Sequence, residues 1–408
     1  MGCGSVGGSP ETRRMTVKTI KKIENMPFFC GVRESPLRKS TIPDNLPFSL
    51  GVSSPGGLIV QVPDHRVLDA LRRSYEEEDV FLTSPMDESP MTCWRGEECI
   101  DVLCNSAKYS IRGKRLLEIG CSTGYLLNEF RKRGAIVRGC EPGPSALIAR
   151  ERYGLEVDND FFRPGLYQEG YDIVILFTVL EHVVDPVDFL SQVVRILKPG
   201  GRIFLGVPDC EAELTTGDPG MLLHEHWSYF TLPSLTRLLR STGFADVHCF
   251  RTPKGTLYGW GTLSDDNSPP NEISDSPRDP DMANNYVNKL EKTIRNMDRW
   301  LSRAREKGER IGFYGASGGA ANLLSFINWH DMSLTIYDTD PLKHGKYLPD
   351  CELEIRSPGD LLNDMPDCIL ILPVNFAESI RTYLKNDLKI PQNVTILTLE
   401  DVMNGKIS

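Results

Sequence analysis

The middle of the chain alternates between short apolar runs and longer segments that carry charged residues. Between residues 106 and 263 the runs are almost continuously apolar and rich in β-branched residues, which is typical of parallel strands buried on both faces. Helices are expected between them, as for DFLSQVVRILK (188–198), which Pro199-Gly200-Gly201 would end. The alternation predicts an α/β domain built on a doubly wound sheet. The expected strands are LLEI (116–119), IVRGC (136–140), YDIVILF (171–177) and RIFLGV (202–207), and ADVHCF (245–250) and TLYGWGTL (256–263) are expected to form a closing hairpin.

A second α/β unit is predicted for residues 282–408. After an acidic, Pro/Ser-rich linker (264–281), apolar positions recur on one stripe of a long helix. A strand–glycine–helix segment follows (310–327), then the strand-like runs SLTIYD (333–338) and DCILILP (367–373). We therefore expect a small C-terminal doubly wound domain. The stripe of the long helix consists of Tyr286, Leu290, Ile294, Met297 and Leu301.

The N-terminal third is expected to contain little regular structure. Residues 1–27 are small, polar and basic without a periodic apolar face, so we expect a disordered arm. Residues 28–105 contain one strand-like run (57–62) and one helical pattern (67–78), separated by many prolines. A small module or lid is predicted here.

Composition excludes several classes of protein. The chain has 408 residues and a formal charge of −10, which argues against a nucleic-acid binder. No run reaches the roughly 18 apolar residues of a membrane span, and the start MGCGSVGGSP lacks the apolar core of a signal peptide. The 11 cysteines are odd in number and scattered, as in reducing compartments. We expect a cytoplasmic protein of unspecified oligomeric state that acts on a small molecule.

The segment LLEIGCSTGY (116–125) predicts a ligand site after the first strand of the central domain. A dinucleotide site prefers G-x-G-x-x-G, but Ser122 occupies the middle glycine position, which weakens the case for a pyrophosphate. Glu141 follows the second strand, 21 residues after Gly120, where a carboxylate can accept both hydroxyls of a ribose. A nucleoside without a pyrophosphate fits this pattern best.

Four motifs in this order resemble the class I S-adenosylmethionine-dependent methyltransferases. They are LLEIGCSTG, the acidic Glu141, YDIVILFTVLEHVVDP (171–186) and the LKPGG turn (197–201). The resemblance implies a Rossmann-like methyltransferase sheet in which Glu118 and the glycine turn hold the methionine part of the cofactor and Glu141 holds the ribose. Asp160 and Phe161 would contact the adenine. The full set implied for cofactor binding is Glu118, Gly120, Cys121, Gly124, Tyr125, Glu141, Pro142, Asp160, Phe161, Phe177 and Leu180.

A closer resemblance follows from HEHWSYF (224–230) together with YGASGGAANLLSF (314–326) and YDTDPLKHGKYLPD (337–350). These segments are similar to the sugar C-methyltransferases of antibiotic deoxysugar pathways. That family implies proton abstraction next to a ketone, followed by in-line methyl transfer to the enolate. Glu225 and His226 would lie at the catalytic centre with His224 beside them; His182 is expected only to line the cofactor pocket.

The sequence departs from that family in ways that leave the substrate open. The family's paired cysteine motif is missing at Cys30, so no zinc is expected, and the short spacing of the His-Glu-His run argues against a metal site there. Leu223 replaces a tyrosine, and the C-terminal glycine turn at Ser317–Ala320 lacks a lysine. An O- or N-methyltransferase, or a cofactor-binding protein with degenerate catalysis, therefore remain alternatives.

Overall fold

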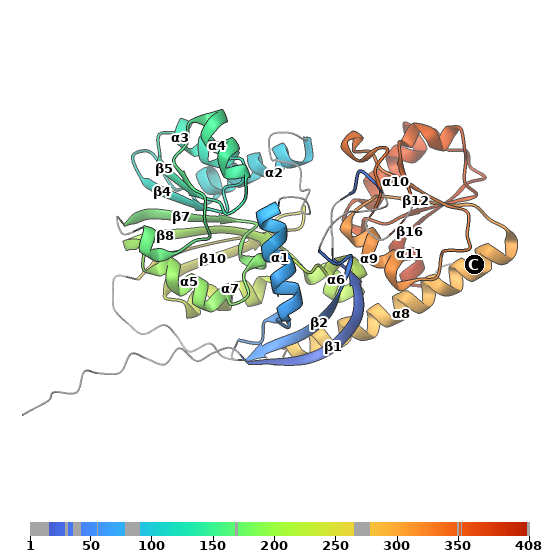
Figure 1. Cartoon of the computed structure of the whole chain (residues 1–408), viewed down its shortest axis with the longest axis horizontal. Coiled ribbons are helices and arrows are strands. Elements are labelled where there is room, and N and C mark those ends of the chain that lie inside the picture. The colour runs from blue at the N-terminus through green and yellow to red at the C-terminus, as the bar shows by residue number, and fades with distance from the viewer. Residues whose placement is uncertain are drawn as a thin grey trace, which may run out of the picture.

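The computed structural model describes residues 16–28, 32–35, 42–54, 56–77, 90–167, 170–264, 278–348, 351 and 353–405. In this part of the chain, strands form sheets of four, seven and five members. The seven-stranded and five-stranded sheets lie at opposite ends of the molecule, and the N-terminal strands lie between and below them (Figure 1). The α/β fold class predicted from the sequence is confirmed.

The seven-stranded sheet has the order β10-β11-β8-β7-β4-β5-β6. Its neighbours pair in parallel from β6 to β8, whereas β11 is antiparallel to both β8 and β10. Because β4 pairs with β5 on one side and β7 on the other, the chain changes winding direction there, and a ligand crevice is expected at the carboxyl ends of these strands. The strands are β4 (Arg115–Ile119), β5 (Ile136–Cys140), β6 (Val157–Asp158), β7 (Tyr171–Phe177), β8 (Leu197–Pro208), β10 (Phe244–Arg251) and β11 (Thr256–Leu263).

Helices cover both faces of this sheet, which explains the continuous apolar runs. Alternate strand residues point to opposite faces: Leu117 lies in one buried cluster with Leu190 and Leu235, and Leu116 lies in another with Phe130. The first face is covered by α5 (Pro186–Val194) and α7 (Leu232–Ser241), and the second by α2 (Pro90–Asp101), η1 (Val102–Ser106), α3 (Tyr125–Lys132) and α4 (Ser145–Tyr153).

The prediction that α2 belongs to an N-terminal module ending at residue 105 is wrong. Cys99, Val102 and Leu103 are buried in the cluster that also contains Leu126 and Phe130 of α3. Residues 90–106 therefore pack on the methyltransferase sheet and extend its helical layer.

The predicted disordered arm is also wrong for its second half. Residues 16–27 form β1, which pairs antiparallel with β2. Two register shifts interrupt this ladder, between Thr19 and Lys21 and between Ile23 and Met26. Each bulge interrupts the alternation of apolar and polar residues along β1. The sequence of β1 therefore lacks the pattern that predicts a strand. Residues 1–15 lie outside the described part of the chain.

The four-stranded sheet takes its last member from the central domain. Its order is β1-β2-β3-β9, and Ile59 and Val60 pair with Tyr229 and Ser228. The strand β9 belongs to HEHWSYF, so the N-terminal sheet directly holds the segment expected to be catalytic. The elements are β1 (Thr16–Pro27), β2 (Asn45–Ser54), β3 (Ile59–Gln61) and β9 (Ser228–Tyr229), and α1 (His65–Glu77) follows β3.

The five-stranded sheet is entirely parallel, in the order β14-β13-β12-β15-β16, which confirms the doubly wound C-terminal unit. The long helix α8 begins at Arg278, inside the stretch predicted as linker; residues 265–277 lie outside the described part. The elements are α8 (Arg278–Lys307), β12 (Ile311–Tyr314), α9 (Gly318–Phe326), β13 (Leu334–Tyr337), β14 (Ile355–Arg356), β15 (Cys368–Ile371), α10 (Ala377–Asn386), β16 (Thr395–Thr398) and α11 (Leu399–Met403).

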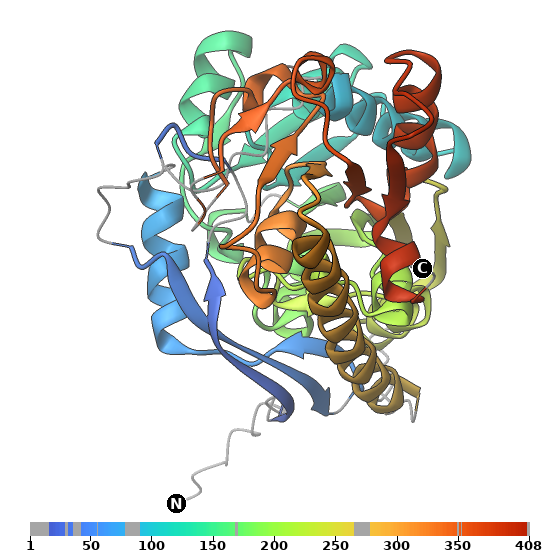
Figure 2. The same cartoon turned by 90° about the vertical axis from the view of Figure 1, so that its right-hand side faces the viewer.

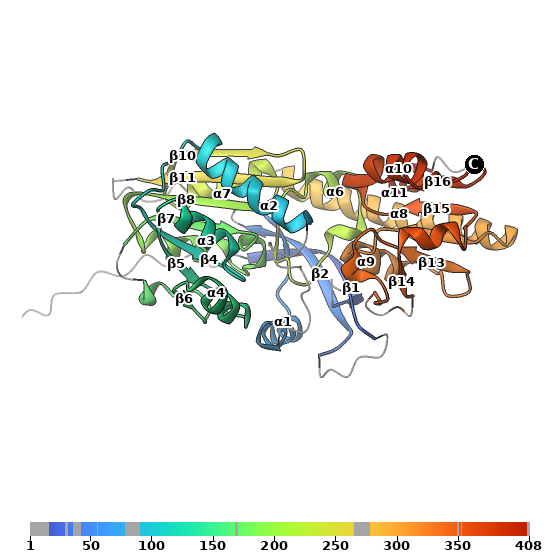
Figure 3. The same cartoon turned by 90° about the horizontal axis from the view of Figure 1, so that it is seen from above.

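The helix α8 and the short turn η4 (Pro219–Met221) connect the three parts. Figure 2 shows α8 running from the C-terminal sheet toward the N-terminal strands, and Figure 3 shows those strands between the two larger domains. The hydroxyl of Tyr286 in α8 donates to the carbonyl of Asp218 (3.0 Å), and the amide of Asn322 in α9 donates to the carbonyl of Leu222. Contacts from the C-terminal unit therefore fix the segment that leads into His224.

Within the described residues, no helix is long and apolar enough to cross a membrane.

Candidate active site

The glycine turn after β4 depends on two left-handed residues. Gly120 has φ 75° and Gly124, which caps α3, has φ 80°, a region that side chains disfavour. A Cβ on Gly120 would lie 2.4 Å from Cγ2 of Val179, in the loop after β7. The turn is therefore packed directly against the loop that carries Glu181 and His182.

Two carboxylates lie at the carboxyl edge of β4 and β5. The two oxygens of Glu141 accept hydrogen bonds from the backbone N–H groups of Ser122 and Gly143, each at 2.9 Å. Glu118 is 2% exposed, and its Oε2 has no hydrogen-bond partner within the described part of the chain. Burial, together with the charge of Glu141, raises the pKa of Glu118 well above its ordinary value. A cationic or hydroxyl-bearing ligand would satisfy the unpaired oxygen.

The remaining predicted cofactor residues fall into two groups. Asp160 follows β6 and is paired with Arg163 (3.1 Å), and the Phe161 ring is 47% exposed, so both lie at the accessible edge of the sheet. Phe177 and Leu180 are instead buried in the two core clusters, where the Phe177 ring stacks on Tyr258 at 6.1 Å. Cys121 is likewise buried, Pro142 is half-buried and accepts from the amide of Asn159 (3.1 Å), and Tyr125 begins α3.

The expectation that His224 is catalytic does not fit its surroundings. Its Nδ1 lies 3.1 Å from the carbonyl oxygen of Pro27 and its Nε2 lies 3.3 Å from that of Pro47, both in the N-terminal sheet. Burial lowers the pKa of His224 to about 4, and the rings of Phe28 and Phe48 lie against it. His224 ties the segment to the N-terminal strands, so we assign it a structural role.

His226 meets a pair of residues that follow β7. The rings of His226 and His182 are 5.0 Å apart, edge to face, and Nδ1 of His182 lies 2.9 Å from the carbonyl oxygen of Glu225. The Nε2 of His182 is 3.9 Å from a carboxylate oxygen of Glu181, which is 2% exposed. The backbone N–H of Trp227 donates to the carbonyl of Glu181 at 2.7 Å. The sequence predicted a catalytic role for Glu225 and His226 but not for Glu181. Glu181 lies within the LEH triplet (180–182), which was the available signal for it.

Family models match two stretches of the chain. A methyltransferase domain covers residues 91–249, and a C-methyltransferase C-terminal domain covers residues 271–390. The chain is a class I S-adenosylmethionine-dependent methyltransferase. The boundary of the first match agrees with the packing of α2 on the methyltransferase sheet.

Relatives of this methyltransferase include both C- and O-methyltransferases. C-methyltransferase NovU from Streptomyces niveus is 28% identical over 290 residues, covering 66% of this chain and 68% of NovU. Ubiquinone biosynthesis O-methyltransferase from Saccharophagus degradans is 34% identical over 99 residues, 22% of this chain and less than half (42%) of that protein. Among solved structures, 1,6-didemethyltoxoflavin-N1-methyltransferase of Burkholderia thailandensis is 16% identical and covers 57% of this chain and 100% of its own, with a TM-score of 0.38.

A positive charge from α2, that of Arg95, acts on Glu181 and His226. Burial raises the pKa of Glu181 to about 7, while the charges of His182 and Arg95 oppose that rise. Burial lowers the pKa of His226 well below its ordinary value, and the charges of His182 and Arg95 add to this. His226 is therefore neutral near pH 7, and Glu181 is partly protonated.

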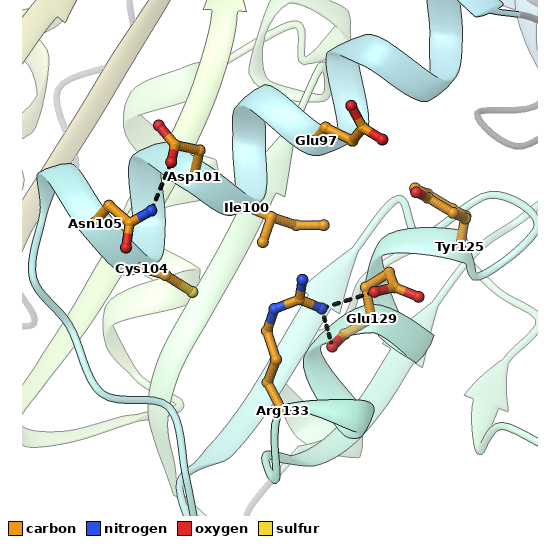
Figure 4. Close-up of a pocket in the computed structure, with 8 residues that line it drawn as sticks. All are labelled: Glu97, Ile100, Asp101, Cys104, Asn105, Tyr125, Glu129 and Arg133. Carbon is orange, nitrogen blue, oxygen red and sulfur yellow. Dashed lines mark hydrogen bonds and ion pairs between the residues drawn. The ribbon is translucent and has the colours of Figure 1, made fainter.

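A cavity of about 410 Å³ lies between α2, η1 and α3 of the methyltransferase (Figure 4). Neither Glu181 nor His226 is among the residues that line it. Of the predicted cofactor residues only Tyr125 lines it. Arg133 pairs there with Glu129 at 2.7 Å. This cavity is therefore separate from the cluster of Glu181, His182 and His226.

The glycine turn of the C-terminal domain is filled by the chain itself. The Oδ2 of Asp338, at the end of β13, accepts from the N–H of Ala316 (2.8 Å) and from Nζ of Lys343 (2.9 Å). Its Oδ1 accepts from the N–H of Asp340 at 2.8 Å. In a nucleotide site this carboxylate would bind a ribose, but here three of its roughly four acceptor positions already accept bonds from the chain itself.

Proposed function

We propose that the protein C-methylates an enolisable small metabolite, such as a nucleotide-linked keto-deoxysugar, with S-adenosylmethionine as methyl donor. The observation that carries this is the convergence of Glu225 and His226 with the Glu181–His182 pair at the carboxyl edge of the sheet, beside the glycine turn. Similarity to NovU over 66% of the chain supports carbon as the methylated atom.

The cofactor would lie across the carboxyl ends of β4, β5 and β6. The buried, unpaired oxygen of Glu118 suits the ammonium group of the methionine moiety. Glu141 would accept the ribose hydroxyls with the lone pairs that its two backbone bonds leave available. Asp160 and the exposed ring of Phe161 would flank the adenine. The role of the glycine turn is to let the chain approach the ligand closely.

The chemistry needs a proton acceptor and correct positioning. Removal of the proton next to the ketone gives an enolate; its carbon then forms a bond to the methyl group as the sulfur–methyl bond breaks, leaving S-adenosylhomocysteine. The sulfonium is already activated, so the protein contributes orientation and a base. Neutral His226 can accept the proton, but its lowered pKa makes it a weak base, so Glu225 is the alternative acceptor.

Hydrogen exchange at the acceptor tests C-methylation directly. In deuterated water, a nucleotide-linked 4-keto-6-deoxyhexose should exchange its C3 proton when the protein and S-adenosylhomocysteine are present, because enolisation precedes transfer. Nuclear magnetic resonance measures the exchange, with protein-free sugar as the control. Methylation of the sugar without any exchange in the presence of S-adenosylhomocysteine would favour O-methyl transfer, to which the ubiquinone O-methyltransferase relatives point.

Glu141→Ala should weaken S-adenosylmethionine binding tenfold or more, about 1.4 kcal/mol, because the ribose loses its charged acceptor. Calorimetric titration of both S-adenosylmethionine and S-adenosylhomocysteine measures the effect. Glu129→Ala is the matched control, since it removes the same charge from α3 where Glu129 pairs with Lys132 (2.6 Å). Equal affinity for wild type and Glu141→Ala would remove Glu141 from the cofactor site.

A further inference from the structure

We propose that Glu181, His182 and His226 form a binding site for a divalent metal ion, and that this ion binds the acceptor's oxygen during methyl transfer. The second part rests on the proposed function, whereas the first concerns the protein alone. In the sequence, the candidate histidine ligands lie in the His-Glu-His run (224–226), where the residues are too closely spaced to bind one metal ion together. The fold instead joins one histidine of that run to two residues that lie more than 40 positions earlier.

The geometry of the three donors suits a metal ion. One ligand atom from each residue lies within 4.8 Å of the other two, and Nε2 of His182 is 3.9 Å from Oε1 of Glu181. Bonds of about 2.0–2.2 Å to nitrogen and oxygen place neighbouring ligands roughly 3 Å apart, so small side-chain rotations would close the site. Glu181 and His182 are fixed by one short turn, η3 (Leu180–His182), at the end of β7.

A backbone hydrogen bond fixes the tautomer of His182 that can bind a metal ion through Nε2. Its Nδ1 lies 2.9 Å from the carbonyl oxygen of Glu225, and a carbonyl can only accept, so Nδ1 carries the hydrogen. The Nε2 atom on the side of Glu181 then carries the lone pair. A histidine whose second nitrogen donates to a carbonyl is the usual arrangement around protein-bound metals.

The burial of Glu181 is a second, independent reason to expect a ligand at this site. It is 2% exposed, and its Oε2 has no hydrogen-bond partner among the residues that the structure describes. Buried carboxylate oxygens are nearly always paired, so we expect a ligand to bind Oε2 of Glu181. Among the described residues, the charges that act on Glu181 include the positive charge of Arg95 and the negative charge of Glu225.

Two imidazoles and one carboxylate leave coordination positions open, an arrangement suited to Zn²⁺, Mn²⁺, Fe²⁺ or Co²⁺. An ion here would polarise the acceptor's ketone and stabilise the negative charge of the enolate oxygen. If His226 binds the metal ion, its ring nitrogen has no lone pair left to accept a proton. The proton next to the ketone then passes to Glu225. The site thus resolves which of the two residues is the base.

Cobalt provides a direct probe of the site. The full-length protein, stripped with chelator and freed of it, is titrated with Co²⁺ in the absence of any acceptor. We expect visible absorption bands that saturate at one ion per chain.

Glu181→Gln should weaken Co²⁺ binding tenfold or more. Glu129→Gln, which neutralises a carboxylate of α3 that pairs with Lys132 and Arg133, should not change it. His182→Gln is a second variant should Glu181→Gln fail to fold, as judged by circular dichroism. Absence of the bands, or equal affinity in wild type and Glu181→Gln, would overturn the metal site whatever the acceptor. Full methylation and proton exchange by metal-free protein would overturn the ion's catalytic role. Co²⁺ binding with no keto sugar methylated would reject the proposed acceptor and support the site.

Discussion

His226→Ala is expected to slow methyl transfer by about 10²- to 10⁴-fold, the usual effect of losing a group that handles the transferred proton. The loss follows whether His226 accepts the proton itself or holds a metal ion that activates the acceptor. Its ring lies 5.0 Å from that of His182, after β7, whereas Glu118 and Glu141, the proposed cofactor residues, lie at the ends of β4 and β5. Affinity for S-adenosylmethionine should therefore stay within about threefold, less than 0.7 kcal/mol.

His248→Ala is the matched control for this variant. His248 is exposed on β10, where its ring stacks on Trp260 at 5.6 Å, and it has no contact with the catalytic cluster. Single-turnover methylation and calorimetry together separate chemistry from cofactor binding. If His226→Ala kept most of its activity, the catalytic assignment of the cluster would be wrong. Equal losses of rate and cofactor affinity would instead indicate a collapse of the loop after β7.

The central domain could be predicted because its signal is local. Each strand is buried on both sides, as Leu116 and Leu117 show by pointing into different clusters, so apolar residues run without interruption. The order of the glycine turn, Glu141 and the LEH loop then places all three at one edge of a parallel sheet. The same reasoning predicted the C-terminal unit and the stripe of α8.

The features that the sequence did not predict depend on contacts between distant segments. The strand β1 carries two bulges that hide its alternation, and β9 is two residues long and exists only because β3 pairs with it. Glu181 meets His226 through the fold alone, and no spacing rule connects them. The His-Glu-His run suggested a catalytic role for His224, but the fold places its two ring nitrogens next to the carbonyl oxygens of Pro27 and Pro47. The sequence identified chemistry-bearing residues but not which of them face one another.

Gly124→Ala is expected to lower the free energy of unfolding of the methyltransferase domain by about 2–5 kcal/mol. A non-glycine residue in the left-handed region costs about 1–2 kcal/mol, and Gly124 has φ 80°. Its new Cβ would also lie 2.8 Å from the Cβ of Ala149 and 2.7 Å from Cδ1 of Leu155, between α3 and α4. Overpacking of this kind adds about 1–3 kcal/mol.

Gly154→Ala separates the two costs. Gly154 ends α4 with φ 60°, but a Cβ there would have nothing within 4 Å. It should therefore show only the backbone cost, about 1–2 kcal/mol. Urea unfolding followed by circular dichroism compares the two variants, and titration with S-adenosylhomocysteine shows whether Gly124→Ala also distorts the turn. Equal destabilisation by both would mean that α3 and α4 move apart at little cost; the glycine would then serve backbone conformation alone. A larger loss for Gly124→Ala, with weaker binding, would show that close packing of α3 on α4 shapes the cofactor cradle.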